Sequence, residues 1–249
     1  MNVVISDTKH ELGVKAGTLA AELIRETIAQ KGFANIILAT GTSQFQTLEQ
    51  LIKEENIDWG KVTMFHLDEF IDLPLAHAAS FRKYLKERFL DKVPALKAVH
   101  LINGEGDIEK EIASLNSIIS QHPIDVALVG IGENGHLAFN DPPADFENEN
   151  PYHIVNLDQP CRMQQMGEGW FGSLEEVPLQ AISMTVKQIM KSRYIVCSVP
   201  DERKALAVKN SLLQEVSNMY PASILQNHAH CTFFLDKSSA SLLSEKAIA

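Results

Sequence analysis

The sequence predicts a doubly wound, mainly parallel α/β sheet flanked by helices, built as one domain over residues 1–249. Short apolar runs with strand character alternate with segments of helical periodicity along most of the chain, and strands joined through helices pair in parallel with right-handed crossovers. The run 126–129, VALV, has no polar alternation, which is typical of a strand buried on both faces. No linker, repeat or low-complexity tract divides the chain.

The first half of the chain supplies the early strands and the helices between them. Strands are expected at residues 3–5, 35–39 and 62–67, with a short edge strand at 100–102. Thr8 and Glu11 form a capping box at the start of the first helix, and Gly32 ends that helix as a left-handed cap. Ser80 and Asp107 begin two later helices, the second of which leads into the strand at 126–129.

From Pro142 to Pro178 the pattern weakens to a polar stretch with few periodic apolar positions. Long irregular stretches inside compact domains are often lids or binding loops, so we expect residues 143–178 to form a lid segment. Trp170 and Phe171 lie between glycines and form either the part that closes or a local hydrophobic anchor. Beyond this segment we expect strands at 181–185, 194–199 and 231–235 and helices at 186–191, 201–213 and 221–225.

Composition limits the partners of the protein. The formal net charge is −10, from 22 basic and 32 acidic residues, which argues against nucleic acid or an anionic membrane as a partner. A phosphorylated small molecule remains open, because backbone amides and one or two local cations can hold a phosphate. The three cysteines are far apart and suggest reduced thiols, with no disulfide framework and no metal site. With no signal peptide and no membrane-length apolar run, we expect a cytoplasmic protein.

Polar residues follow the second predicted strand. The sequence Thr40-Gly41-Thr42-Ser43 stands at a strand end and a helix start, where hydroxyl and backbone N–H groups suit a phosphate or another anion. The motif is neither a dinucleotide fingerprint nor a Walker loop. The alternative is that Thr42 or Ser43 simply caps the helix.

Two further candidates are single charged residues. Asp68 follows the predicted strand at 62–67, and an acid at such an exit can serve as a general base, although paired acids in a turn are usually only solvated. Lys204 lies in the first turn of a predicted helix, where a cation opposes the helix dipole and invites an anionic partner. Asp201 and Glu202 nearby could be that partner.

The loop after the strand at 126–129 carries Asn134, His136 and Asp141 between glycines. The imidazole offers a ring nitrogen for proton transfer, and the carboxylate and amide can orient it. The alternative is an ordinary loop with a solvated histidine. In open α/β sheets ligands lie outside the carboxyl ends of the strands, so these loops are expected to converge.

Taken together, the motifs resemble the glucosamine-6-phosphate deaminase (isomerase) family, which has a Rossmann-like fold. The resemblance covers nearly the whole chain and rests on LATGTS at 38–43, FHLDEFIDLP at 65–74, GIGENGHLAFNDP at 130–142 and KALA from 204. The sugar-phosphate lactonases share the fold and a related Gly-rich loop. Their sequence after the histidine differs, whereas AFNDP at 138–142 resembles the deaminase version.

The resemblance implies specific roles. Residues 40–43 and Lys204 would bind the sugar phosphate, and Asp68 would move a proton between C2 and C1 of the amino sugar. His136, oriented by Asn134 and Asp141, would open the pyranose ring. The products would be a ketose 6-phosphate and ammonia, with no metal or organic cofactor. Family members are often oligomeric, so the resemblance makes a homo-oligomer a possible form of this protein.

The chain departs from the family pattern at several positions. Well-studied deaminases carry Asp at the place of Asn134 and Glu at the place of Asp141. The phosphate-binding arginine of the family's lid has no clean counterpart, since Arg162 is offset and Glu168 falls near the expected place. The galactosamine branch resembles this chain at 72–74 and 221–223, so the configuration at C4 stays open. Allosteric-site residues find no clear match, and we expect no allosteric control.

Two other functions stay open at the sequence level. A sugar-phosphate lactonase would not need Asp68 for proton exchange at carbon. A non-catalytic sugar-phosphate sensor would keep the pocket without turnover. The sensor is disfavoured because Asp68 and His136 are both present and the chain has no basic DNA-binding segment.

Overall fold

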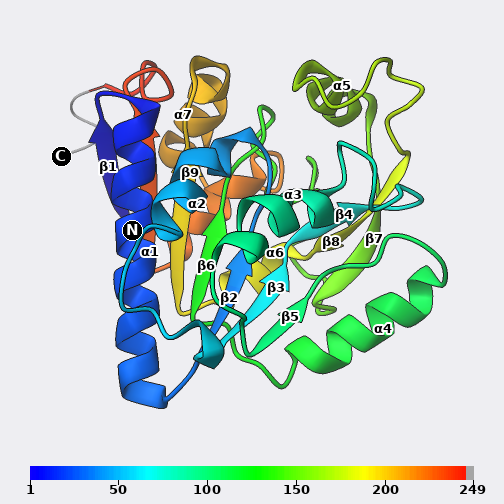
Figure 1. Cartoon of the computed structure of the whole chain (residues 1–249). Coiled ribbons are helices and arrows are strands. Elements are labelled where there is room, and N and C mark those ends of the chain that lie inside the picture. Colours follow the sequence, from blue (N-terminus) through cyan, green and yellow to red (C-terminus); the bar gives the residue numbers. More distant parts are fainter. Residues whose placement is uncertain (245–249) are drawn as a thin grey trace.

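The protein is described by a computed structural model that covers residues 1–244; the last five residues of the predicted domain, 245–249, lie outside it. A seven-stranded sheet forms the centre, with strand order β1-β10-β9-β6-β2-β3-β5 and every pairing parallel (Figure 1). Its strands are β1 (Asn2–Ser6), β2 (Ala34–Leu38), β3 (Val62–His66), β5 (Ala98–His100), β6 (Val126–Val129), β9 (Tyr194–Val199) and β10 (Cys231–Asp236). The predicted α/β class with a mainly parallel sheet is confirmed.

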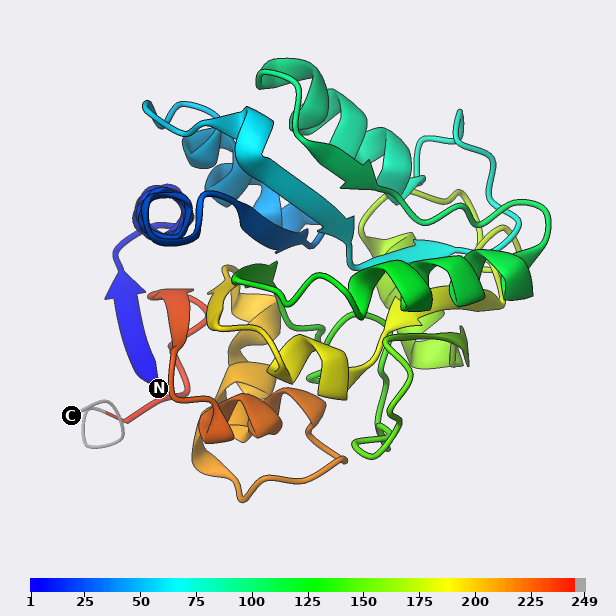
Figure 2. The same ribbon diagram turned by 90° about the horizontal axis from the view of Figure 1, so that it is seen from below.

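Helices cover both faces of this sheet, as the doubly wound prediction requires. On one face lie α1 (Lys9–Lys31), α2 (Phe45–Leu51) and α3 (Phe81–Arg88). On the other lie α4 (Ile108–Ile119), α6 (Val186–Met190), α7 (Ala205–Leu213) and the 3₁₀ segment η5 (Pro221–Asn227). Figure 2 shows the first set on the opposite side of the strands from α6, α7 and η5. The remaining 3₁₀ segments are η1 (Thr42–Gln44), η2 (Trp59–Lys61), η3 (Leu90–Lys92) and η4 (Glu202–Lys204).

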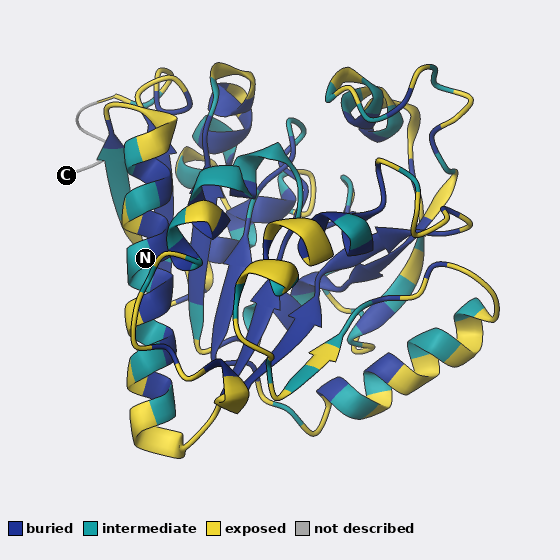
Figure 3. Cartoon of the chain, in the orientation of Figure 1, coloured by how far each residue is buried: buried dark blue, intermediate teal, exposed yellow. Residues whose placement is uncertain are grey.

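Alternation along the strands produces two separate cores. In β2, Ile36 and Leu38 pack with α1 and α2, whereas Ile37 packs on the opposite face. All four residues of β6 are buried, as predicted for a strand covered on both faces, and the central strands are uniformly buried in Figure 3. Within residues 1–244 no helix combines the length and the apolar character needed to cross a membrane.

Predicted caps define several helix ends. The side chain of Thr8 accepts a hydrogen bond from the Glu11 amide at the start of α1, and Gly32 closes that helix with φ +81°. Ser80 and Asp107 cap α3 and α4 in the same way. The helix expected over 201–213 differs: η4 precedes it, and α7 begins only at Ala205. The edge strand expected at 100–102 lies slightly earlier, as β5.

A second, antiparallel sheet was not predicted. Its order is β4-β8-β7, formed by β4 (Asp68–Phe70), β8 (Gln180–Met184) and β7 (Tyr152–Asn156). β4 follows β3 after a single residue and is only three residues long, so it carries no periodic signal of its own. The expectation that 143–178 is irregular is therefore wrong in part, because this segment holds β7 and the helix α5 (Gln159–Gly167).

An aromatic cluster anchors this second sheet and α5. The rings of Phe70, Phe81, Phe139 and Phe171 pack with centroids 5.0–5.9 Å apart, and Cys161 of α5 is buried in the same cluster. Arg162 donates to the carbonyl oxygens of Leu174 and Val177, which ties α5 to the chain that follows it. The segment above the sheet is thus held by its own apolar core.

Candidate active site

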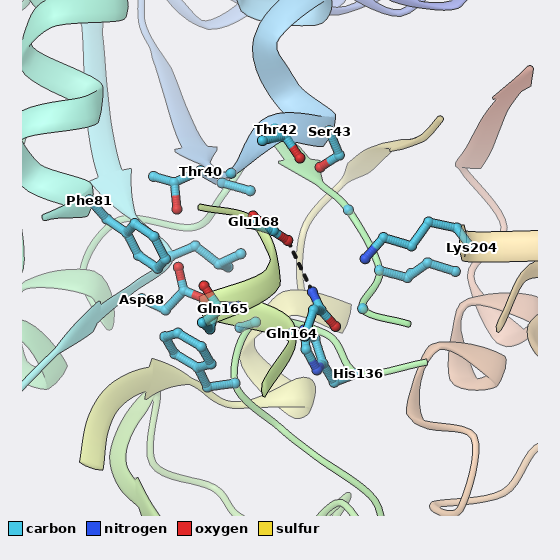
Figure 4. Close-up of a pocket in the computed structure, with 18 residues that line it drawn as sticks. Thr40, Thr42, Ser43, Asp68, Phe81, His136, Gln164, Gln165, Glu168 and Lys204 are labelled. Atoms are coloured by element: carbon cyan, nitrogen blue, oxygen red, sulfur yellow. Dashed lines mark hydrogen bonds between the residues drawn. The ribbon is translucent and has the colours of Figure 1, made fainter. Parts of the chain in front are cut away.

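A cavity lies at the carboxyl ends of four adjacent strands, β9, β6, β2 and β3, with α5 on its outer side. Figure 4 shows the side chains that line it. The predicted residues in its wall are Thr40, Gly41, Thr42, Ser43, Asp68, His136 and Lys204. Asn134 and Asp141 do not line the cavity and stand behind His136. The convergence expected of the strand-end loops is therefore present.

The loop after β2 presents hydroxyl groups that cap no helix. The N-cap of η1 is Gly41, with φ +88°, and neither η1 nor α2 has a side-chain cap. The capping explanation for Thr42 and Ser43 is therefore wrong. The Tyr84 hydroxyl donates to the Gly41 carbonyl at 3.0 Å, which fixes the loop from α3. Within residues 1–244 the hydroxyls of Thr40 and Thr42 form no hydrogen bond, so they are free to meet a ligand.

Asp68 and Glu69 are neighbours in sequence with opposite environments. Glu69 is fully buried and accepts hydrogen bonds from the Ser80 hydroxyl at 3.0 Å and from the Arg82 amide at 2.8 Å. Asp68 is 7% exposed, lines the cavity, and its carboxylate has no hydrogen-bond partner among the described residues. Burial raises the pKa of Asp68 to about 8, and the charge of Glu69 acts in the same direction. Asp68 is therefore able to take and return a proton near neutral pH.

His136 is held by both of its predicted partners. Its Nδ1 atom lies 2.9 Å from Oδ1 of Asp141, and its backbone amide donates to the Asn134 side chain at 3.0 Å. Asn134 also donates to the same Asp141 oxygen at 2.9 Å. Burial acts to raise the pKa of Asp141, but the bonds from His136 and Asn134 outweigh it and hold the pKa below its ordinary value. An ionised Asp141 on Nδ1 leaves Nε2 as the free nitrogen of the ring.

Gly132 allows the imidazole to take this position. A Cβ atom at residue 132 would lie 2.3 Å from Cε1 and Nε2 of His136. The glycine in the loop is thus required by the approach of the ring to the backbone.

Lys204 is the cation of the cavity. It is 6% exposed and forms no ion pair with any residue between 1 and 244. Asp201, offered above as its partner, instead accepts from the Arg203 amide and pairs with the Arg203 guanidinium. Burial lowers the pKa of Lys204, and Glu168 and Glu133 act in the opposite direction. A lysine that lines the cavity and has no ion-pair partner within residues 1–244 is available to pair with an anionic ligand.

One helix contributes wall residues that the sequence reasoning missed. Gln164, Gln165 and Glu168 of the α5 segment line the cavity, and Phe81 of α3 joins them. The signal was available in the spacing Cys161, Gln164, Gln165 and Glu168, which is one face of a helix. The position near the family's arginine is thus a cavity-facing carboxylate, Glu168. Arg162 donates hydrogen bonds to the chain that follows α5 and does not line the cavity.

Three residues beside the cavity form one group of potential metal ligands. Among the described residues, His136, Asp141 and Cys161 place one ligand atom each within 4.8 Å of one another. Burial raises the pKa of the Cys161 thiol, so the thiol stays protonated. The neutral thiol and the existing His136–Asp141 hydrogen bond favour an acid–base pair at this place.

The fold and the cavity define a class: an α/β protein whose cavity, at the carboxyl ends of its strands, combines a buried lysine with acid–base side chains. The chain belongs to the family described as glucosamine-6-phosphate isomerases/6-phosphogluconolactonase, whose model matches residues 7–234. The predicted family is thereby confirmed, and with it the prediction of an enzyme.

Relatives of known name span nearly the same length. The chain is 35% identical over 231 residues to a glucosamine-6-phosphate deaminase of Streptococcus pyogenes serotype M1, covering 92% of this chain and 96% of the relative. It is 34% identical over 246 residues to the Bacillus cytotoxicus deaminase, covering 98% and 90%. Among solved structures, a monomeric glucosamine-6-phosphate deaminase matches with a TM-score of 0.88 at 31% identity, covering 97% of this chain and 100% of that one. The 6-phosphogluconolactonase of Trypanosoma brucei matches with a TM-score of 0.80 at 17% identity, which reflects the fold.

Proposed function

We propose that this protein isomerises and deaminates a 2-amino-2-deoxyhexose 6-phosphate, giving a ketose 6-phosphate and ammonia. Glucosamine 6-phosphate is the first substrate to test, because the relatives above are named for it. The observation that carries the proposal is that Asp68, His136 and Lys204 face one cavity, and that within residues 1–244 Asp68 has no hydrogen-bond partner and Lys204 no ion-pair partner.

Lys204 and the hydroxyls of Thr42 and Ser43 would bind the phosphate. Figure 4 places Lys204 and Asp68 on opposite sides of the cavity, so a phosphate at Lys204 leaves the far end of the sugar towards Asp68. Binding energy from a remote phosphate holds a flexible open chain in the reactive arrangement.

Nε2 of His136 would move the proton that opens the pyranose ring. The ring oxygen gains a proton as the C1 hydroxyl loses one, which gives the free aldehyde. Asp141 stabilises the imidazolium that forms during this exchange, since it lies on Nδ1 at 2.9 Å. Asn134 adds a hydrogen bond to Asp141 and brings no charge of its own.

Asp68 would then carry the isomerisation. Its carboxylate removes the proton from C2 while the 2-ammonium group of the sugar gives one proton to the aldehyde oxygen, which produces an enolamine. Asp68 then returns its proton to C1, so that C1 becomes an alcohol and C2 an iminium. Water adds to C2 and ammonia leaves, which produces the ketone. A carboxyl group with a pKa of about 8 is a stronger base than an ordinary aspartate, as removal of a carbon-bound proton requires.

Ammonia release tests the proposal directly. The purified protein is incubated with glucosamine 6-phosphate and, separately, with galactosamine 6-phosphate, with Asp68→Asn as the inactive control. Ammonia from either sugar supports the proposal, and the ratio of rates identifies the C4 epimer. If neither sugar releases ammonia while 6-phosphogluconolactone is hydrolysed, the lactonase function replaces it. If the sugars bind without any turnover, the protein is a sensor.

Three predictions accompany this function. Residues 143–178 act as a lid that admits substrate from the α5 side. The protein resides in the cytoplasm. Its assembly is either a monomer or a homo-oligomer. The structurally similar deaminase is described as monomeric, so sedimentation of the purified protein decides between a monomer and a larger assembly.

A further inference from the structure

The inner face of α5 is polar where a packed helix is usually apolar. Gln164, Gln165 and the C-cap residue Glu168 line the cavity, whereas Cys161 packs in the aromatic cluster and the exposed side of α5 carries Met163 at 51% exposure. Helices of globular proteins direct their apolar stripe inward. The reversed pattern over the cavity indicates that α5 faces a polar ligand.

Gln165 is the buried and unpaired member of this face. It is 6% exposed and lines the cavity, and its side-chain amide forms no hydrogen bond with any residue between 1 and 244. Gln164 is different: it accepts from the Glu133 amide at 3.0 Å and donates to Glu168 at 3.2 Å. An amide that lines the cavity and has no hydrogen bond to the described residues is available to pair with a ligand group.

We propose that Gln165 is a substrate-binding residue, whose amide exchanges hydrogen bonds with uncharged hydroxyl groups of the sugar chain. This proposal rests on the function above and deepens it. In the proposed function Lys204 binds the phosphate, and Asp68 and His136 act at the reacting carbons. The hydroxyl groups between the phosphate and the reacting carbons then have no assigned binding residue. An amide can donate and accept at once, as a hydroxyl group can, and it carries no charge that would oppose the phosphate. Gln165 of the lid segment thus binds the uncharged part of the substrate.

The test compares two ligands in the whole protein. The probes are 2-amino-2-deoxyglucitol 6-phosphate, an open-chain analogue with its hydroxyls, and inorganic phosphate, which has none. Gln165→Met keeps the side-chain length and removes the amide, and Gln165→Asn keeps the amide one methylene shorter. Gln159→Met, at an exposed position of the same helix, is the control. Calorimetry gives both dissociation constants, and steady-state kinetics with glucosamine 6-phosphate gives kcat and KM.

For Gln165→Met we expect the analogue to bind about tenfold or more weakly and kcat/KM to fall by a similar factor, with phosphate binding unchanged. Gln165→Asn should lie between the wild type and Gln165→Met. Equal affinity of wild type and Gln165→Met for the analogue would overturn the proposal, as would equal weakening of both ligands, which indicates a structural role. The binding measurement stands even if no sugar releases ammonia, so a failure of the proposed reaction is distinguishable from a failure of this role.

Discussion

The strand-end loops and the α5 segment build the same cavity by different means. Thr42 and His136 lie on loops that continue directly from β2 and β6, and Asp68 opens β4 one residue after β3; the strands β2, β3 and β6 are buried on both faces. The α5 segment is held by the separate cluster around Phe70 and Phe171. The loops supply the groups that change protonation, whereas α5 supplies amides and one carboxylate. The residues proposed for proton transfer thus follow strands of the central sheet, and the residues proposed to contact the neutral part of the ligand lie on the segment above it.

The largest expected effect tests the role of Asp68, which follows strand β3 of the central sheet. Asp68→Asn should lower kcat by about 10³-fold, because the amide cannot accept the carbon-bound proton. Binding of 2-amino-2-deoxyglucitol 6-phosphate should change little, since the substitution keeps the shape of the side chain. Asp58→Asn, an exposed acid, serves as the matched control in the ammonia assay. Turnover at the wild-type rate would remove Asp68 from the mechanism.

The pH dependence should report the same carboxyl group. Asp68 acts as a base only when ionised, and its pKa in the folded protein is about 8. We expect kcat/KM to rise about tenfold per pH unit below that value and to level above it. The Gln165→Met variant should keep this profile at a lower level. A profile that is flat between pH 6 and 8 would contradict the role of the buried acid.

Stability should respond to pH with a defined sign. The pKa of Asp68 rises from 3.8 to about 8 on folding, so the folded chain retains a proton that the unfolded chain releases in this interval. Its contribution is therefore fully present below pH 4 and is lost as the pH rises through 8. Asp68→Asn should gain stability over the wild type by several kcal/mol at pH 8 and not at pH 4. Urea unfolding at both pH values measures this, and a gain that does not grow with pH would refute it.

A smaller effect is expected at the phosphate end. Lys204→Ala should raise KM for the sugar phosphate by about 10- to 100-fold with a modest change in kcat, because a charge-assisted bond to a remote group is lost. Inhibition by inorganic phosphate should weaken in parallel. Lys209→Ala, further along α7, is the control. An unaltered KM would mean that Lys204 does not bind the phosphate.

The smallest expected effect sharpens the contribution of α5. Glu168 lines the cavity and its charge acts on Lys204, so it opposes an incoming phosphate. Glu168→Gln should tighten phosphate binding by about two- to fivefold, as expected for a partly solvated charge. Calorimetry with inorganic phosphate measures this change. Weaker binding would indicate that Glu168 takes part in holding the ligand.

Much of the fold and part of the candidate site could be predicted from local patterns. The helix capped by Thr8 and Gly32 and the buried strand at 126–129 are each specified by residues close together in sequence. The structure confirms both. The family is readable because the motifs at 38–43, 65–74 and 130–142 each follow a strand. Since parallel strands end at one edge of the sheet, their convergence followed from the fold class.

The second sheet and the roof of the cavity could not be predicted in this way. β4 is three residues long and pairs with β8, more than 100 residues further along the chain. α5 directs polar side chains towards the cavity, against the usual pattern, so their helical spacing groups these residues on one face without showing that this face covers a site. Both features depend on contacts between distant segments.

The sequence by itself determined the sheet, its helices and the strand-end residues, because each is specified by local periodicity, caps and turns. Tertiary structure alone decided which of two adjacent acids faces the cavity. Glu69 accepts hydrogen bonds from Ser80 and Arg82, whereas Asp68, pointing to the other side of β4, faces the cavity and has no hydrogen-bond partner in the described part of the chain. Tertiary structure likewise distinguishes Gln164, which accepts a hydrogen bond from the Glu133 amide, from Gln165, whose amide has no hydrogen bond within residues 1–244. The protonation and pairing of a side chain depend on burial and on partners far away in sequence, and only the folded chain brings these together.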